Sequence, residues 1–201
     1  MCIRDRGVFG HLGRAVFYPH IPDITPAVVA CVSDSFYKII SEALSVLKKI
    51  VEIIRPLDEE SGYLYQQHVG DIYTATLARL KATDIDQEVK EMAITCMGQI
   101  LSHFGPELTS ELPTCLPIFL DRLRNEITRL TAVRALNTIA RSPNRVDLTL
   151  ILNESIQLQA SFLRKNHRDL KLATLTCLDS IVQVYGDKLA PDLVAMVMCI
   201  K

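Results

Sequence analysis

Asp84 and Asp86 are the two carboxylates whose close spacing could support acid–base chemistry, in which one carboxyl group donates a proton and the other accepts one. They directly precede apolar residues at helical spacing, beginning at Val89. Aspartate is preferred at such a place because its side chain accepts hydrogen bonds from free N–H groups and its charge complements the helix dipole. The pair therefore predicts the start of a helix in preference to a catalytic site.

A metal site would need several ligating side chains at suitable spacing, and His103 with Cys96 and Cys115 comes nearest to one. Their spacing matches no recognised zinc site, and both cysteines fall on apolar helix faces, as do Cys31 and Cys177. Cysteine packs there as a small apolar residue. No two of the six cysteines form a C-x-x-C pair. We therefore expect no metal, and a reducing compartment, namely the cytoplasm and nucleus.

Signatures of other chemistry are absent from the sequence. It has no G-x-S-x-G nucleophile elbow, phosphate-binding loop or dinucleotide fingerprint. The basic run Arg164–Arg168 predicts a solvated turn, because basic and aromatic residues do not alternate on any face. The net charge is −1, and no apolar run approaches the ~18 residues of a membrane-spanning helix. We therefore expect a non-enzymatic chain without cofactor, and no nucleic acid, membrane or small-molecule substrate as its partner.

The elements that would position these residues follow a repeat. Lys90, Arg129 and Lys171 occupy equivalent places, 39 and then 42 residues apart, and each precedes the same spacing of small and apolar residues. A related helix covers Phe36–Ile54. A period near 40 residues is typical of stacked helical hairpins, which usually hold partners and do not transform substrates.

A second type of helix alternates with the first. Its apolar stripe runs from Val69 to Leu80 and recurs 43 residues later from Leu112 to Leu123, with looser versions near Pro22 and from Asp147. Proline or glycine falls between the hairpins, where proline disfavours a helical residue before it and glycine allows a left-handed cap. These breakers are Arg55-Pro56, Gly105-Pro106, Ser142-Pro143 and Gly186. The prediction is an all-α fold, a HEAT-repeat α-solenoid of four antiparallel hairpins.

The same signals predict the domain organisation. Residues 1–6 fit no repeat and are expected to be a non-native or disordered start, followed by the end of a preceding repeat or a linker at 7–21. Four HEAT repeats are expected at 22–56, 68–105, 106–146 and 147–187. The truncated first helix of a further repeat is expected at 188–201.

An inserted acidic loop at 57–67 breaks the regular spacing, since the interval from Lys38 to Lys90 is 52 residues. We interpret it as a solvated surface insertion, with a binding loop as the alternative.

The second helices of such a solenoid usually line its concave wall, where partners bind. Ser102 falls opposite their buried stripe, and so do our candidates for partner contact. These candidates are Glu91, Thr95, Arg134, Arg141, Thr176, Asp179 and Gln183. Arg134 and Arg141 lie seven residues apart and share one helix face, although ordinary solvated charge would also explain them.

Several exact strings go beyond a general similarity to HEAT repeats and resemble the cullin-associated CAND family. They include exposed and loop residues that packing would not dictate, and the resemblance covers about residues 16–190. The strings are Asp34–Lys38, Ser41–Leu44, Arg79–Glu91, Cys96–Ile100, Asn125–Thr131 and Ala160–Asn166.

The resemblance implies a function as well as a fold. CAND proteins are built of HEAT repeats, wrap around cullin–RING ubiquitin ligase scaffolds that lack the ubiquitin-like modifier, and promote exchange of substrate receptors. This segment resembles the middle of that arch, which implies a partial cullin-cradling surface and a cullin–RING scaffold protein as partner. No single functional residue carries over, because the matching strings are mostly helix-packing positions. A HEAT-repeat scaffold or adaptor of nuclear transport or of a phosphatase remains the alternative.

Overall fold

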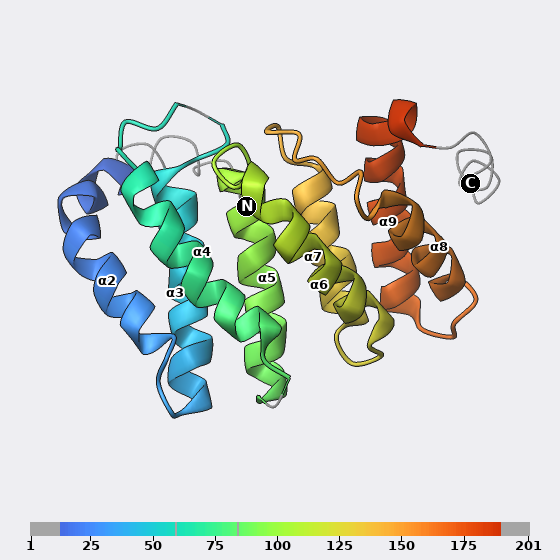
Figure 1. The fold of residues 1–201 in the computed structure, drawn as a ribbon, viewed down its shortest axis with the longest axis horizontal. Helices are drawn as coiled ribbons and strands as arrows, with labels where there is room; N and C mark the ends of the chain where they lie inside the picture. The colour runs from blue at the N-terminus through green and yellow to red at the C-terminus, as the bar shows by residue number, and fades with distance from the viewer. Residues whose placement is uncertain (1–12, 59, 84, 190–201) are drawn as a thin grey trace, which may run out of the picture.

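The computed structural model describes residues 13–58, 60–83 and 85–189, and these contain helices α2 to α9 and no β-strand (Figure 1). The expected non-native start at 1–6 and nearly all of the expected helix at 188–201 lie outside the described residues. The helices are α2 (Ile21–Cys31), α3 (Tyr37–Ile54), α4 (Gln66–Lys81), α5 (Gln87–Phe104), α6 (Leu112–Arg124), α7 (Arg129–Ala140), α8 (Leu152–Phe162) and α9 (Arg168–Tyr185). Short 3₁₀ turns are η1 (Tyr18–His20), η2 (Thr109–Glu111) and η3 (Gly186–Lys188).

Consecutive helices pair into four antiparallel hairpins that stand side by side in a row (Figure 1). The first helices of the pairs, α2, α4, α6 and α8, form one layer, and the second helices, α3, α5, α7 and α9, form the other. The second helices pack against one another more extensively than the first helices do. The predicted all-α array of stacked hairpins is confirmed.

The apolar stripes form the core of this array. In α3, for example, Leu44, Leu47, Val51 and Ile54 are fully buried, as their spacing predicts. Asp86 is the N-cap of α5, and its side chain accepts a hydrogen bond from the backbone N–H of Glu88 at 2.8 Å. The carboxylate at Asp86 therefore begins a helix, as its position in the sequence indicates.

The glycines that end second helices do so for a different reason from the one expected. Gly105 and Gly186 both have right-handed backbone angles, with φ of −47° and −56°, so the predicted left-handed caps are wrong. At Gly105 a Cβ atom would lie 2.7 Å from Val146 Cγ2 and 2.9 Å from the carbonyl oxygen of Leu101. Close approach of the next loop, and not backbone conformation, requires glycine there.

The first helix of the fourth pair begins at Leu152, five residues later than the stripe from Asp147 suggests. Arg145 adopts a positive φ of 47°, and the Asp147 carboxylate accepts hydrogen bonds from the backbone N–H and the hydroxyl of Thr149. These local bonds favour a turn over a helix. Buried Leu148 then joins the core from the loop.

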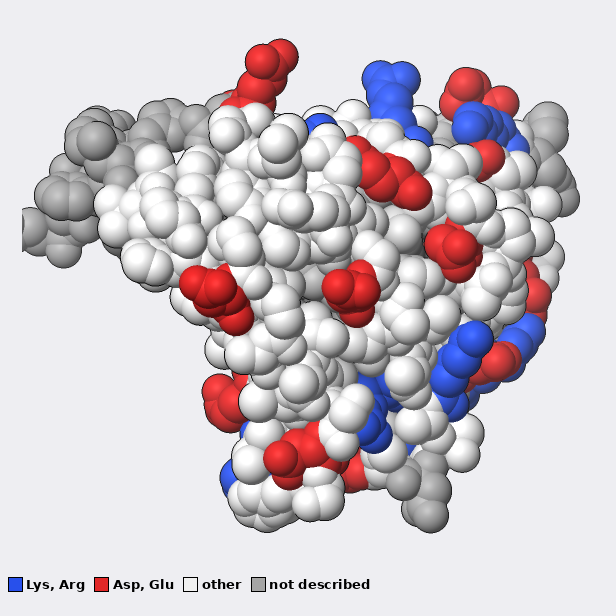
Figure 2. Space-filling view, turned by 60° about the vertical axis from the view of Figure 1, so that its left-hand side comes forward, with Lys and Arg blue, Asp and Glu red and all other residues white. Residues whose placement is uncertain are grey.

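The α2 end of the stack presents an apolar surface. Asp23 is the charged residue within α2, and the view that brings this end forward shows uncharged side chains over most of it (Figure 2). A groove of about 400 Å³ lies between α2 and α3 and includes Cys31, Ile39 and Val46. Cys31 lies on an apolar helix face, as the sequence indicates, but it is exposed because no described helix covers that face of α2.

The acidic inserted loop is anchored at two points. The Tyr65 ring stacks on Phe104 with centroids 5.6 Å apart, and its hydroxyl donates a hydrogen bond to Glu107. From the middle of the loop, the Ser61 hydroxyl donates to the carbonyl oxygen of Ile54 at the end of α3. Glu60 and Leu64 project from the anchored loop and are exposed.

Loops that connect one hairpin to the next are tied to the C-terminal ends of second helices, along the upper edge in Figure 1. The side chains of Ser142 and Asn144 donate to the carbonyl oxygen of Ser102 at 2.5 and 2.8 Å. The buried Tyr185 hydroxyl donates to the carbonyl oxygen of Val146 at 2.7 Å. Ser102 is buried beneath this loop, so its expected place on the partner-facing side is wrong.

Arginines join the layer of first helices. Arg79 of α4 donates to the carbonyl oxygen of Val32, the C-cap of α2, at 2.7 Å. Arg122 of α6 likewise donates a hydrogen bond to the carbonyl oxygen of Leu80 in α4, at 2.5 Å. Between α6 and α8 the link is instead an ion pair of Arg124 with Glu154.

Candidate protein-binding surface

A groove of about 510 Å³ follows the seam between α5 and α7. Its lining includes Glu91 and Thr95 from α5 and Arg134 from α7. The two helices approach closely at its floor, because a Cβ atom on Gly98 would lie 2.9 Å from Cβ of Ala135. A small residue at position 98 therefore lets the helices form a shallow, well-defined channel.

Two further grooves follow the seam between α7 and α9. One of about 200 Å³ includes Arg134 and Thr176 in its lining, and the next, of about 430 Å³, includes Arg141, Thr176 and Asp179. Gln183 also lines the second of these. Since Arg134 borders both seams and Thr176 borders two successive grooves, the three grooves are adjacent parts of one surface on the layer of second helices.

The structure thus brings all seven candidate residues to one grooved face. Some of their side chains already form hydrogen bonds within the protein, and others do not. The hydroxyls of Thr95 and Thr176 donate to the carbonyl oxygens of Glu91 and Leu172, four residues earlier in the same helix. Gln183 donates to Asp179 at 2.8 Å.

Arg134 and Arg141 are exposed, and neither forms an ion pair with a described residue. Both guanidinium groups can therefore pair with carboxylates of a binding partner.

Sequence reasoning missed other residues that line the same grooves. Lys48 reaches the α5–α7 groove from α3, and Gln99 lies one turn after Thr95. Leu172 lines an α7–α9 groove and is 66% exposed. The i, i+4 spacing from Thr95 to Gln99 and from Leu172 to Thr176 is the signal that could have found two of them.

The buried thiols of this array are poor nucleophiles. Burial raises the pKa of Cys96, Cys115 and Cys177 to about 12, and a neutral thiol neither attacks a substrate readily nor binds a metal as a thiolate. The described residues contain no cluster of three side chains that could hold a metal ion. Within the same described ranges, no helix is long and apolar enough to cross a membrane.

Stacked helical hairpins with one grooved, charged face define a helical-repeat protein of the α-solenoid class. A family model described as "CAND1-like, TPR repeats" matches residues 8–97. The chain is 50% identical over 181 residues to Cullin-associated NEDD8-dissociated protein 1 of Drosophila melanogaster, which is 89% of this chain and 14% of the relative. It is also 50% identical over 193 residues to Cullin-associated NEDD8-dissociated protein 2 of Mus musculus, covering 96% of this chain and 16% of that protein.

A plant relative extends the similarity. Cullin-associated NEDD8-dissociated protein 1 of Arabidopsis thaliana is 45% identical over 177 residues, or 88% of this chain and 14% of the relative. The chain is a homologue of the CAND family, and it spans about one sixth or less of the length of these relatives.

Repeat length places the hairpins nearer to HEAT than to TPR geometry. The second helices α5, α7 and α9 begin at Gln87, Arg129 and Arg168, intervals of 42 and 39 residues. TPR units repeat every ~34 residues and HEAT units every ~40–47. The spacing supports HEAT-like units within a segment whose family description names TPR repeats.

Proposed function

We propose that this chain is a non-catalytic scaffold segment that binds an unmodified cullin–RING complex through its layer of second helices. The observation that carries the proposal is the gathering of the seven candidate residues into three adjacent grooves, with Arg134 bordering two of them. The homologues are named as cullin-associated proteins. A homologous segment with a grooved face is therefore expected to form part of a cullin-contacting surface.

The chemistry of the grooves supports binding. Their lining combines guanidinium, carboxylate, amide and hydroxyl groups with a few apolar side chains, among them Met92 and Leu172. Such mixed surfaces give specificity through charge complementarity and steer association. We propose that the segment contributes part of the binding surface on which receptor exchange by the whole protein depends. We also propose the cytoplasm and nucleus as its location, in keeping with three buried free thiols.

The sharpest test reverses charge at Arg134 and Arg141 together in the whole protein. Because the two side chains are exposed, the variant R134E/R141E should keep its helical content while its affinity for unmodified cullin–RING complex falls by about tenfold or more at low salt. The loss should shrink as salt rises, since exposed charges are screened over ~8–10 Å at physiological ionic strength.

A matched control makes the same change in charge elsewhere. Lys81 and Arg145 are exposed and line none of the three grooves, so K81E/R145E should bind as the parent does. If R134E/R141E bound the cullin–RING complex as tightly as K81E/R145E does, Arg134 and Arg141 would not be part of the interface. Capture of nuclear-transport factors or phosphatase subunits in place of cullin by the parent protein would reject the proposed partner.

A further inference from the structure

A separate groove of about 360 Å³ opens at the other edge of the stack, between the α6–α7 turn and the α8–α9 loop. Both segments lie at the lower edge in Figure 1. Ile127, Leu130 and Leu170 supply its apolar lining, and Lys165 and His167 border it from the loop. Ile127 is 65% exposed. Together with Leu130 and Leu170, this side chain gives the groove an apolar centre beside a charged border, the arrangement that protein interfaces have.

The turn that carries Ile127 is held in place from within. The Asn125 side chain accepts the backbone N–H of Ile127 at 2.9 Å, and the Thr128 hydroxyl donates to the carbonyl oxygen of Arg122 at 2.9 Å. Arg129 donates to the carbonyl oxygen of Arg124 at 3.1 Å. The exposed isoleucine is therefore presented by an ordered turn, which lowers the conformational entropy lost when a partner covers it.

The groove has an excess of positive charge around it. Arg164, Lys165 and Arg168 are exposed, and none of them forms an ion pair with a described residue. Glu126 also lines the groove, where it pairs with Arg129 at 3.3 Å, and Asp169 lies along a different groove.

The N-terminal end of α7 adds to the positive charge around the groove. The helix has no acidic residue in its first turn and no side-chain cap at Thr128, so the partial positive charge of its N-terminal end remains uncompensated by its own side chains.

From these observations we infer that the groove binds a short acidic segment of a protein partner, with one apolar side chain of that segment seated against Ile127 and Leu130. This surface is distinct from the three grooves assigned to cullin. Its recognition combines an apolar anchor with carboxylates that pair with the cations of the α8–α9 loop.

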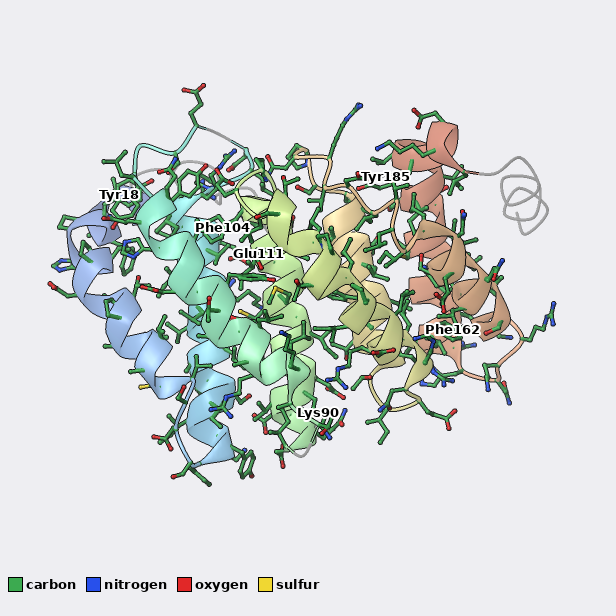
Figure 3. All side chains as sticks on the ribbon, in the orientation of Figure 1. Tyr18, Lys90, Phe104, Glu111, Phe162 and Tyr185 are labelled. Carbon is green, nitrogen blue, oxygen red and sulfur yellow. The ribbon has the colours of Figure 1, made fainter. Side chains whose placement is uncertain are left out.

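A single-stranded nucleic acid fits the groove less well. Such ligands are held by bases that stack on exposed aromatic rings, and the groove lining contains no tryptophan, tyrosine or phenylalanine. Phe162 lies near this edge (Figure 3), but it is buried and the Arg129 guanidinium covers it at 5.2 Å from the ring centroid. Basic charge beside an apolar anchor favours an acidic peptide.

The test uses an array of short peptides in which one Leu or Phe moves through a frame of Asp and Glu, with matched arrays that have Asn and Gln frames or Ser in place of the apolar residue. The intact chain should bind the acidic apolar peptides at least about tenfold more tightly than either matched set, and binding should weaken as salt rises. An oligouridine probe tests the nucleic-acid alternative.

Substitutions then locate the site. Ile127→Ser and the double change K165E/R168E should each weaken the best peptide at least about tenfold. The control K81E removes an exposed cation outside the groove and should leave binding unchanged. Equal binding of the charged and uncharged frames, undiminished binding by both variants, tighter binding of oligouridine, or no peptide binding at all would overturn the proposal.

Discussion

The two layers of helices differ in how closely neighbouring hairpins approach. Along the layer of second helices the contacts between neighbours are extensive, and a Cβ atom on Gly98 would meet Ala135 at 2.9 Å, whereas neighbouring first helices contact one another much less. Close-packed helices resist displacement, while the first helices are joined by arginines that reach across to backbone carbonyls. The comparison teaches that the grooved surface is built on the more closely packed of the two layers.

Truncating a core leucine to alanine in each layer should give the largest loss in the free energy of unfolding. Leu136 of α7 is 1% exposed and Leu120 of α6 is 7% exposed. Changing either to Ala should cost about 2–5 kcal/mol of unfolding free energy, with Leu136→Ala near the upper end because the closer packing around it relaxes less. Urea denaturation measures both values. A cost for Leu120→Ala that matched or exceeded that for Leu136→Ala would contradict the difference between the layers.

Hydrogen exchange on the same two variants tests how far the damage spreads. Because each hairpin contacts its neighbours, faster exchange should extend to the adjoining hairpins and spare the pair α2–α3. Uniformly faster exchange along the chain would instead indicate a single cooperative unit.

Adding a methyl group at Gly98 tests the close approach of the second helices, and the exposed Gly70 provides a control at an open helix position. Gly98→Ala should destabilise by about 1–3 kcal/mol, because the new Cβ forces α5 and α7 apart. Gly70→Ala lies in a helix with open space around it and should stabilise by about 0.4–1 kcal/mol through reduced freedom of the unfolded chain. Thermal unfolding measures both, and a stabilising Gly98→Ala would reject the close approach.

Loss of a hydrogen bond that holds a connecting loop should cost less stability than loss of core packing. Tyr185→Phe leaves the buried carbonyl of Val146 without its 2.7 Å hydrogen bond and should cost about 1–2 kcal/mol. Arg164→Ala, in the exposed loop at the opposite edge, should change stability by less than about 0.5 kcal/mol. Denaturation midpoints compare the two directly. Similar costs would show that the two edges are held alike.

Mild acidification should have the smallest effect on the free energy of unfolding. It acts through one histidine in each layer of helices. Burial lowers the pKa of His103 in α5, whose Nδ1 donates to the carbonyl of Arg55, and burial also lowers the pKa of His68 in α4. Since the unfolded chain binds protons near pH ~6.5 and the folded histidines bind them only at lower pH, stability is fully present above that value and falls as pH drops below it.

Variants assign that pH dependence to particular side chains. Each of His103→Gln and His68→Gln should flatten the fall in urea midpoint between neutral and mildly acidic pH, and the double variant should flatten it most. A slope that neither change affects would place the titrating groups elsewhere.

Features set by local chemistry were predictable from the sequence. The alternating stripes gave the helical hairpins, because a stripe at i, i+3, i+4 must be buried, and the position of Asp86 identified a helix start. Features set by contacts between distant residues were not predictable. Ser102 looked exposed on its own helix, yet a loop 40 residues later covers it.

The candidate surface shows the same division. Helical spacing placed Arg134 and Arg141 on one face, but it did not show that α7 stands between two grooves or that Lys48 reaches in from α3. Nor did it identify Ile127 as an exposed anchor, because its exposure depends on a turn whose hydrogen bonds run to Arg122 and Arg124. The exposure of Cys31 on its apolar face was not predictable either, because burial of such a face depends on a neighbouring helix that the local sequence does not specify.

The change of linkage along the first helices has a mechanical consequence. Where Arg79 and Arg122 grip backbone carbonyls, no opposite charge is present for ions to screen. At the α6–α8 junction the exposed Arg124–Glu154 pair takes over, and its attraction weakens with ionic strength. Added salt should therefore loosen the contact between the first helices of the third and fourth hairpins more than it loosens the two earlier contacts in that layer.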